Sequence, residues 1–305
     1  MGGAAAATVV SPVMLSAPAS ALGSPVKAAG QLAGSYPGRL TTARFGMTSP
    51  RDEWELRLGQ VQATGGKLRG RRLFVSSFSS VPSYLKIAKS EWAAGRFPVL
   101  SLSYKGDTEW AKFANGGYDS ALRTMFTQVK ANGHPMAWTI AHEPIGDGSS
   151  PRYVAMFKHV APMFKAAGIT FGPIYNGYMW SAASQGMTDA QIAAWCPDSL
   201  IPLTAFIGAD CYQGGTFASP GENAAVKINR LNTWAGRHGV TELGLGEYNG
   251  MDANALKAAD DAIRSTSRMG WANVFNSSRN NRPGVDWTLS GARLSEFQRV
   301  LKLQG

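Results

Sequence analysis

The segment Trp138-Thr-Ile-Ala-His-Glu-Pro144 is a short apolar run that ends on a carboxylate, Glu143. A second run, Leu243-Gly-Leu-Gly-Glu-Tyr-Asn-Gly250, places Glu247 in the same way, 104 residues farther along the chain. A carboxylate at the end of a buried strand is poorly hydrated, so it requires a partner or a chemical task. In a chain of alternating strands and helices, the separation corresponds to three βα units.

Apolar runs alternate with amphipathic stretches along the rest of the chain. The pattern predicts eight strands, at about residues 42–45, 72–76, 98–102, 136–142, 169–175, 201–210, 242–247 and 271–275. Helical patterns lie between them or after the last, at about 51–63, 82–94, 118–132, 151–167, 188–195, 222–236, 253–269 and 294–303. Eight such units fit a (β/α)8 TIM barrel better than an open doubly wound sheet. We therefore predict an α/β chain with one barrel domain at residues 39–305.

Residues 1–38 are rich in Ala, Ser, Gly and Pro and have no helical or strand period. This composition predicts a flexible extension or linker. Ser16-Ala-Pro-Ala-Ser-Ala-Leu22 resembles the small-residue region before a signal cleavage site, but no Lys or Arg precedes Lys27. No apolar run in the sequence approaches the roughly 18 residues of a membrane span, so we expect no membrane insertion.

Basic residues outnumber acidic ones, 30 to 20, which gives a net charge of +10. They are scattered along the chain, and the densest group, Lys67, Arg69, Arg71 and Arg72, is expected around a turn. A nucleic-acid partner would require a contiguous basic face, so we expect none. An acidic or cell-envelope polysaccharide fits this charge better.

The two cysteines, Cys196 and Cys211, lie near the two ends of one predicted strand. An eight-residue strand spans about 26 Å, whereas a disulfide requires Cα atoms less than about 7 Å apart. We therefore expect two free, buried thiols without a catalytic role.

Glu143 and Glu247 end the fourth and seventh predicted strands, which face one another across the mouth of a barrel. Active sites of these barrels lie at the carboxyl ends of the strands. Two carboxylates about 5 to 5.5 Å apart are typical of retaining glycosidases, in which one attacks the anomeric carbon and the other protonates the leaving oxygen. The sequence thus predicts glycoside hydrolysis.

Neither a metal nor a cofactor is expected. His142-Glu143 does not begin a His-Glu-x-x-His zinc helix, because the position of the second histidine is Gly146 and Pro144 interrupts the helix. The glycines of Gly244-Leu-Gly246 have the wrong spacing and place in the chain for a dinucleotide loop.

Several of these segments resemble glycoside hydrolase family 26, the family of β-mannanases and related β-glucan-cleaving enzymes. His142 stands before Glu143, where most of the larger retaining clan has Asn. The other similar segments, spread over about residues 95–290, are Tyr153-Val-Ala-Met-Phe-Lys-His-Val160, Phe206-Ile-Gly-Ala-Asp-Cys-Tyr212 and Gly246-Glu-Tyr-Asn-Gly250. The chain differs from the family at Pro144-Ile-Gly146, which no aromatic residue follows closely, and at Ser103-Tyr-Lys105, where a Trp is common.

The resemblance implies a role for each matching residue. Glu143 would be the acid/base and Glu247 the nucleophile. His142 would bond to substrate or to a carboxylate, and Tyr212 would hold the nucleophile by a hydrogen bond.

Other substrate-binding residues are predicted from their positions after strands. Trp287, Trp180 and Tyr104 lie in loops where an aromatic ring could stack on a sugar, and Asn176 and Asp210 are polar strand ends. Trp138, Trp195 and Trp234 are assigned to the core.

The predicted function is retaining hydrolysis of a β-linked polysaccharide, mannan-like, β-glucan or cell-envelope glycan, by double displacement. The alternative is a barrel that only binds glycan, as part of a virion tail or a larger cell-surface assembly. Both interpretations place the protein outside the cell, where such polymers lie.

Overall fold

The computed structural model describes residues 43–182, 186–279 and 284–304. All strand pairs are parallel and form one sheet in the order β5-β4-β3-β2-β1-β9-β8-β7-β6. The strands are β1 (Arg44–Thr48), β2 (Gly70–Val75), β3 (Phe97–Leu102), β4 (Ala137–Ile140), β5 (Thr170–Phe171), β6 (Ile174–Asn176), β7 (Ile207–Tyr212), β8 (Leu243–Asn249) and β9 (Met269–Phe275).

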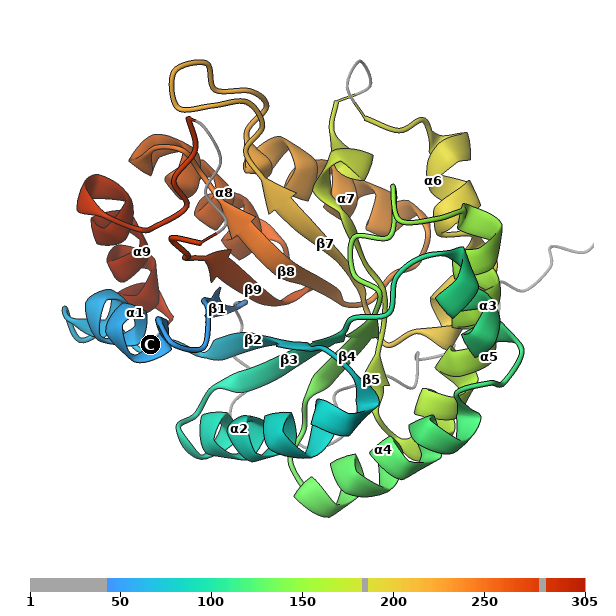
Figure 1. The fold of residues 1–305 in the computed structure, drawn as a ribbon. Coiled ribbons are helices and arrows are strands. Elements are labelled where there is room, and N and C mark those ends of the chain that lie inside the picture. Colours follow the sequence, from blue (N-terminus) through green and yellow to red (C-terminus); the bar gives the residue numbers. More distant parts are fainter. Residues whose placement is uncertain (1–42, 183–185, 280–283, 305) are drawn as a thin grey trace, which may run out of the picture.

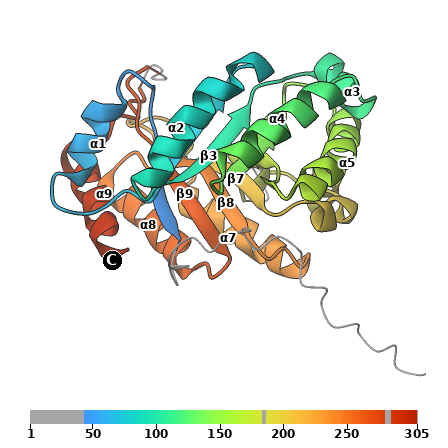
Figure 2. The same ribbon diagram turned by 90° about the horizontal axis from the view of Figure 1, so that it is seen from below.

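Helices cover the outside of this curled sheet, as Figures 1 and 2 show. They are α1 (Trp54–Gln62), α2 (Val81–Ala93), α3 (Asp107–Ala114), α4 (Asp119–Asn132), α5 (Ser150–Ala167), α6 (Asp189–Trp195), α7 (Ala224–Arg237), α8 (Ala253–Ser265) and α9 (Gly291–Leu303). Short 3₁₀ turns are η1 (Phe78–Ser80), η2 (Gly177–Trp180) and η3 (Asp198–Leu203). None of the helices in the described ranges is long and apolar enough to cross a membrane.

The nine strands fill eight barrel positions, because β5 and β6 are two parts of the predicted strand at 169–175. Gly172 and Pro173 interrupt it, and proline has no N–H to donate to a ladder. β5 pairs with β4, and β6 pairs with β7. The Ala205 amide also donates to the carbonyl oxygen of Phe171 (2.8 Å). The broken strand therefore closes the sheet, and the predicted (β/α)8 barrel is confirmed.

Two other predicted elements are corrected. The strand expected at 201–210 begins only at Ile207, because residues up to Leu203 form η3, which contains Pro202. The strand expected at 136–142 ends at Ile140. Helix α3 was not predicted, since its eight residues are too short for a clear period. The free, buried state predicted for both cysteines is confirmed.

Large side chains pack inside the barrel near the amino-terminal ends of the strands. Trp271 is fully buried, with Phe97 at 5.7 Å and Phe206 at 4.7 Å between ring centroids. Gly244 makes room for the indole, because a Cβ at this position would lie 2.2 Å from the ring. These side chains fill the barrel at the amino-terminal ends of the strands.

Candidate active site

A pocket of about 500 Å³ lies at the carboxyl ends of the strands and brings both predicted catalytic carboxylates together. His142, Tyr212 and Trp287, which were predicted to bind substrate, also line it. Phe74, Gln213 and Phe275 complete the lining and were not predicted. A concave site with aromatic walls and a few polar groups is typical of small-molecule binding.

The backbone that presents Glu143 turns sharply out of the sheet. Ala141 and Glu143 both have left-handed backbone angles, φ 53° and φ 52°, which are unfavourable for residues other than glycine. The Ala141 amide donates to Leu102 of β3 (3.0 Å), and the Glu143 amide donates to Ile174 of β6 (2.8 Å). Hydrogen bonds to both neighbouring strands thus hold a strained segment, as is common at functional sites.

Glu247 lies within β8, beside a bulge formed by one extra residue. Ala209 of β7 is opposite Leu245, but Asp210 is opposite Glu247, so Gly246 has no partner in the ladder. The Tyr212 hydroxyl donates a hydrogen bond to Oε2 of Glu247. This contact agrees with the role that the sequence resemblance implied for Tyr212.

A buried ion pair supports Glu247 from inside the barrel. Nη1 of Arg72 lies 2.7 Å from Oδ1 of Asp210 and 3.8 Å from Oε1 of Glu247. The Arg72 guanidinium also donates to the hydroxyl of Ser101 (3.2 Å). Asp210 is therefore a partner of Arg72 and lies behind the pocket instead of lining it.

Arg72 was not predicted as part of the site. The sequence places it in a run of basic residues expected around a turn, but it lies in β2 with its side chain fully buried. The available signal was its position, since it begins the apolar run Leu73-Phe-Val75, where a charge requires a buried partner.

The absence of a side chain at Gly246 makes room for this ion pair. A Cβ at Gly246 would lie 2.3 Å from Oδ1 of Asp210 and 2.4 Å from Nη1 of Arg72. We expect Gly246→Ala to displace the pair, to lower the free energy of unfolding by about 1–3 kcal/mol and to reduce activity. Chemical denaturation and kcat/KM would measure both effects.

Gly59→Ala is the matched control, because Gly59 lies within helix α1 and has no atom within 4 Å of the added Cβ. That substitution should stabilise the fold by about 0.5–1 kcal/mol. Wild-type stability and activity in Gly246→Ala would show that the Arg72–Asp210 ion pair does not require a glycine at this position.

The two glutamates differ in their electrostatic environments. Burial, together with the charges of Asp210 and Glu247, raises the pKa of Glu143 to about 8. Burial raises the pKa of Glu247 to about 7, although the charge of Arg72 opposes this rise. Glu247 is thus the first of the two to ionise, and Glu143 keeps its proton to a higher pH.

His142 lines the same pocket as the two glutamates. Its ring contacts Phe74, with 5.1 Å between centroids. Burial and the charges of Arg72 and Lys105 place the pKa of His142 well below its usual value, so the imidazole is neutral. Its Nδ1 is buried and has no hydrogen-bond partner among the residues that the structure describes.

Trp287, the residue predicted as a sugar platform, contributes its indole ring to the pocket lining. Its ring lies 5.2 Å from that of Tyr212 between centroids, and 7% of the residue is exposed. The Asn249 side chain donates to the Trp287 carbonyl (3.2 Å).

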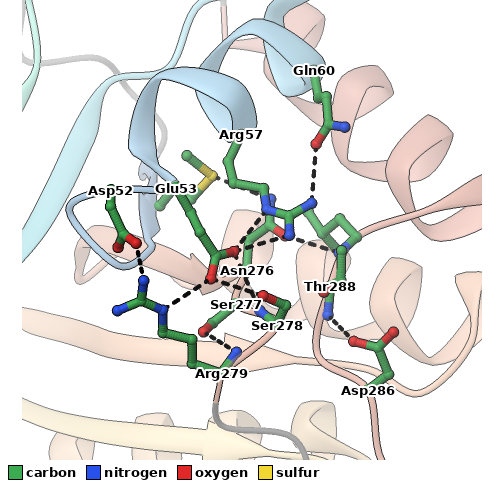
Figure 3. Close-up of polar contacts among 12 residues, drawn as sticks. Asp52, Glu53, Arg57, Gln60, Asn276, Ser277, Ser278, Arg279, Asp286 and Thr288 are labelled. Atoms are coloured by element: carbon green, nitrogen blue, oxygen red, sulfur yellow. Dashed lines mark hydrogen bonds and ion pairs between the residues drawn. The ribbon is translucent and has the colours of Figure 1, made fainter.

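The segment that leads from β9 toward Trp287 is fastened to the loop between β1 and α1 (Figure 3). The hydroxyl of Ser278 donates to Glu53 (2.8 Å), and Arg279 forms ion pairs with Asp52 and Glu53. These contacts join the first and last barrel units beside the pocket.

Besides Asp210, three other residues predicted to bind substrate do not line the pocket. Trp180 is fully buried and packs against Trp234, with 5.1 Å between centroids, so its predicted stacking on sugar is wrong. Tyr104 belongs to an aromatic cluster with Phe78, Phe113 and Tyr118. Asn176 accepts a hydrogen bond from the Ile145 amide (2.8 Å) and so holds the loop after Glu143.

Across residues 43–182, 186–279 and 284–304, no group of three or more His, Cys, Asp or Glu side chains is placed to hold a metal ion.

Similarity to known proteins is structural. No sequence-family description matches the chain, and no curated protein matches it. A fungal β-1,4-galactanase structure aligns with a TM-score of 0.57 at 12% identity, over 84% of this chain and 98% of its own. These proteins share the barrel fold. The GH53 catalytic domain of Ignisphaera aggregans aligns at 0.56 and 13% identity, over 88% and 98%. The exo-β-1,4-mannosidase Op5Man5 from Opitutaceae bacterium strain TAV5 aligns at 0.54 and 11% identity, over 86% and 59%.

Proposed function

We propose that this protein is a retaining glycoside hydrolase that cleaves a β-linked polysaccharide. The observation that carries the proposal is that Glu143 and Glu247, from opposite strands of the barrel, line one pocket with pKa values raised to different extents. Paired carboxyl groups with separated pKa values suit an acid and a nucleophile. Structural likeness to a β-1,4-galactanase and an exo-β-1,4-mannosidase is consistent with this class of substrate.

In the first step, Glu247 attacks the anomeric carbon while Glu143 donates its proton to the departing glycosidic oxygen. The Tyr212 hydroxyl donates a hydrogen bond to Oε2 of Glu247. Oε1 is buried and lies 3.8 Å from Nη1 of Arg72. The nearby Arg72 favours the ionised form of this carboxylate.

In the second step, the glycosyl–enzyme ester is hydrolysed. Glu143, now ionised, takes a proton from water as the water oxygen attacks the anomeric carbon, and Glu247 leaves as a carboxylate. Glu143 regains its proton, and the sugar keeps its β configuration after two inversions. Neutral His142 and the Trp287 ring would hold the sugar during both steps.

The proposal is tested on a panel of β-linked galactan, mannan, β-glucan and cell-envelope glycans, with reducing ends measured. Hydrolysis that is lost in both Glu143→Ala and Glu247→Ala supports the mechanism, and NMR of the first product should show the β anomer. Tight binding without hydrolysis would instead support a glycan-binding barrel. We also propose a relationship to glycoside hydrolase family 26, on the sequence segments that resemble it. We propose an extracellular site of action, because polymers of this kind lie outside the cell.

The pH dependence of activity follows from the two raised pKa values. We expect kcat/KM to fall below about pH 7, where Glu247 becomes protonated, and above about pH 8, where Glu143 loses its proton. The profile should therefore be a narrow bell near neutrality. Initial rates across the pH range would measure it, with Glu143→Gln as the variant that should lose the alkaline limb on activated aryl glycosides. A plateau reaching into acid would contradict this assignment.

A further inference from the structure

The turn that carries Trp287 is bound by side chains from three other segments of the chain. We call residues 286–289 the platform turn. Nη2 of Arg293, on α9, donates to the carbonyl oxygens of Asp286 (2.9 Å) and Thr288 (2.8 Å). One guanidinium nitrogen thus bridges the residues on both sides of Trp287.

The other two side chains come from the ends of β8 and β9. Asn249 donates through Nδ2 to the carbonyl oxygens of Trp287 (3.2 Å) and Phe275 (2.6 Å). Asn276 accepts a hydrogen bond from the Leu289 amide (2.9 Å). Both asparagine side chains are fully buried. The platform turn therefore has a fixed place relative to the two strands.

Arg293 contributes the only charged group of these three side chains. The residue is 8% exposed, and a buried guanidinium requires acceptors because it can only donate hydrogen bonds. Its Nη1 lies 3.4 Å from the carbonyl oxygen of Gly250, and its Cζ lies 5.1 Å from the centroid of the Phe217 ring. The shortest of its hydrogen bonds thus go to the platform turn. Bonds from a charged donor are roughly twice as strong as those between neutral groups.

Movement of the platform turn would move the indole ring of Trp287 in the pocket. This ring lines the pocket together with both glutamates, and its centroid lies 5.2 Å from that of Tyr212. An aromatic ring that is already in place binds a sugar better than one that must be ordered on binding, because ordering costs conformational entropy. A side chain that holds the turn can therefore affect binding without touching the sugar.

We propose that Arg293 is the positioning residue for the sugar platform and acts on the bound glycan through Trp287. This inference rests on the proposed function. Among the described residues, those that line the pocket do not include Arg293. Asn249 is less suitable for a test, because it lies two residues from Glu247 in β8 and its substitution would also disturb the nucleophile.

A double-mutant cycle between Arg293 and Trp287 tests the proposal. Arg293→Met keeps the length of the side chain and removes the guanidinium. On the galactan, mannan or β-glucan that the wild type hydrolyses, it should lower kcat/KM roughly 10-fold, whereas in a Trp287→Ala background it should change kcat/KM less than about twofold. Two residues that act through one ring are non-additive in this way, whereas a general loss of stability lowers both backgrounds alike.

Arg268→Met is the matched control. Arg268 is also partly buried and donates to Asn232 (3.2 Å), but it lies at the amino-terminal end of the barrel, where its carbonyl oxygen accepts from the Leu243 amide. Its substitution should leave kcat/KM within about twofold in both backgrounds. If Arg293→Met does not fold, Arg293→Lys replaces it, because lysine keeps the charge and lacks the planar fork.

The same cycle measured by titration calorimetry in Glu247→Ala gives the coupling for glycan binding alone. Equal losses with and without Trp287, or no loss in either background, overturn the positioning role of Arg293 and leave the proposed function standing. Coupling in binding without hydrolysis by the parent enzyme supports the positioning role and overturns catalysis. Neither binding nor hydrolysis of any glycan in the panel overturns both.

Discussion

Glu247→Ala is expected to reduce kcat by roughly 10⁴-fold or more, as for the loss of other covalent nucleophiles. The reason is that Glu247 is the proposed nucleophile, and no other carboxylate from the described residues lines the pocket except Glu143. Hydrolysis of a β-glycoside with an activated leaving group provides the measurement. Folding should be retained, because alanine removes a buried carboxylate without adding volume.

Azide can test the role of Glu247 independently of the size of the loss. In Glu247→Ala, azide can enter the space left by the carboxylate and attack once, so an α-glycosyl azide should form. In Glu143→Ala, azide should attack the glycosyl–enzyme and give the β-glycosyl azide. The same anomer from both variants would refute the assignment of roles.

Arg72→Met is expected to lower the free energy of unfolding by about 3–5 kcal/mol, because it leaves buried carboxylates without their cation. Asp210 lies 2.7 Å and Glu247 3.8 Å from the guanidinium that would be lost. Urea denaturation at neutral pH would measure the change. Arg123→Met is the matched control, since the side chain of Arg123 on α4 is 68% exposed and its loss should be nearly neutral.

The cost of Arg72→Met should depend on pH in a defined direction. Burial already raises the pKa values of Asp210 and Glu247, and Arg72 opposes this rise. Without Arg72 the folded-state pKa values rise further above their unfolded values, so the variant loses stability as pH increases through that range. The difference from wild type should be small in acid and largest above about pH 8. A difference that is constant with pH would show that Arg72 acts through packing alone.

Much of the barrel could be predicted because its determinants are local. Short apolar runs alternating with amphipathic stretches indicated eight strand positions, and the observed sheet occupies all eight. Two of the errors fell at prolines, where the predicted strand at 169–175 divides at Pro173 and the start of the 201–210 strand becomes η3 around Pro202. Proline removes the ladder donor without changing the apolar pattern.

Part of the site could be predicted as well, because the ends of strands can also be located from local sequence. Glu143, Glu247, His142, Tyr212 and Trp287 follow or end strands, and all line the pocket. Trp180 follows a strand as well, but η2 turns it into the core against Trp234. Phe74 and Gln213 carried no motif and were missed.

By itself, the sequence determined the order of strands and helices and placed two glutamates on opposite strands, because hydrophobic period and strand ends are properties of neighbouring residues. Only the tertiary structure decided that Arg72 and Asp210 meet behind Glu247 and that Gly246 leaves space for them. These features join residues from different strands, and their energies depend on burial and separation in space, which no local pattern encodes.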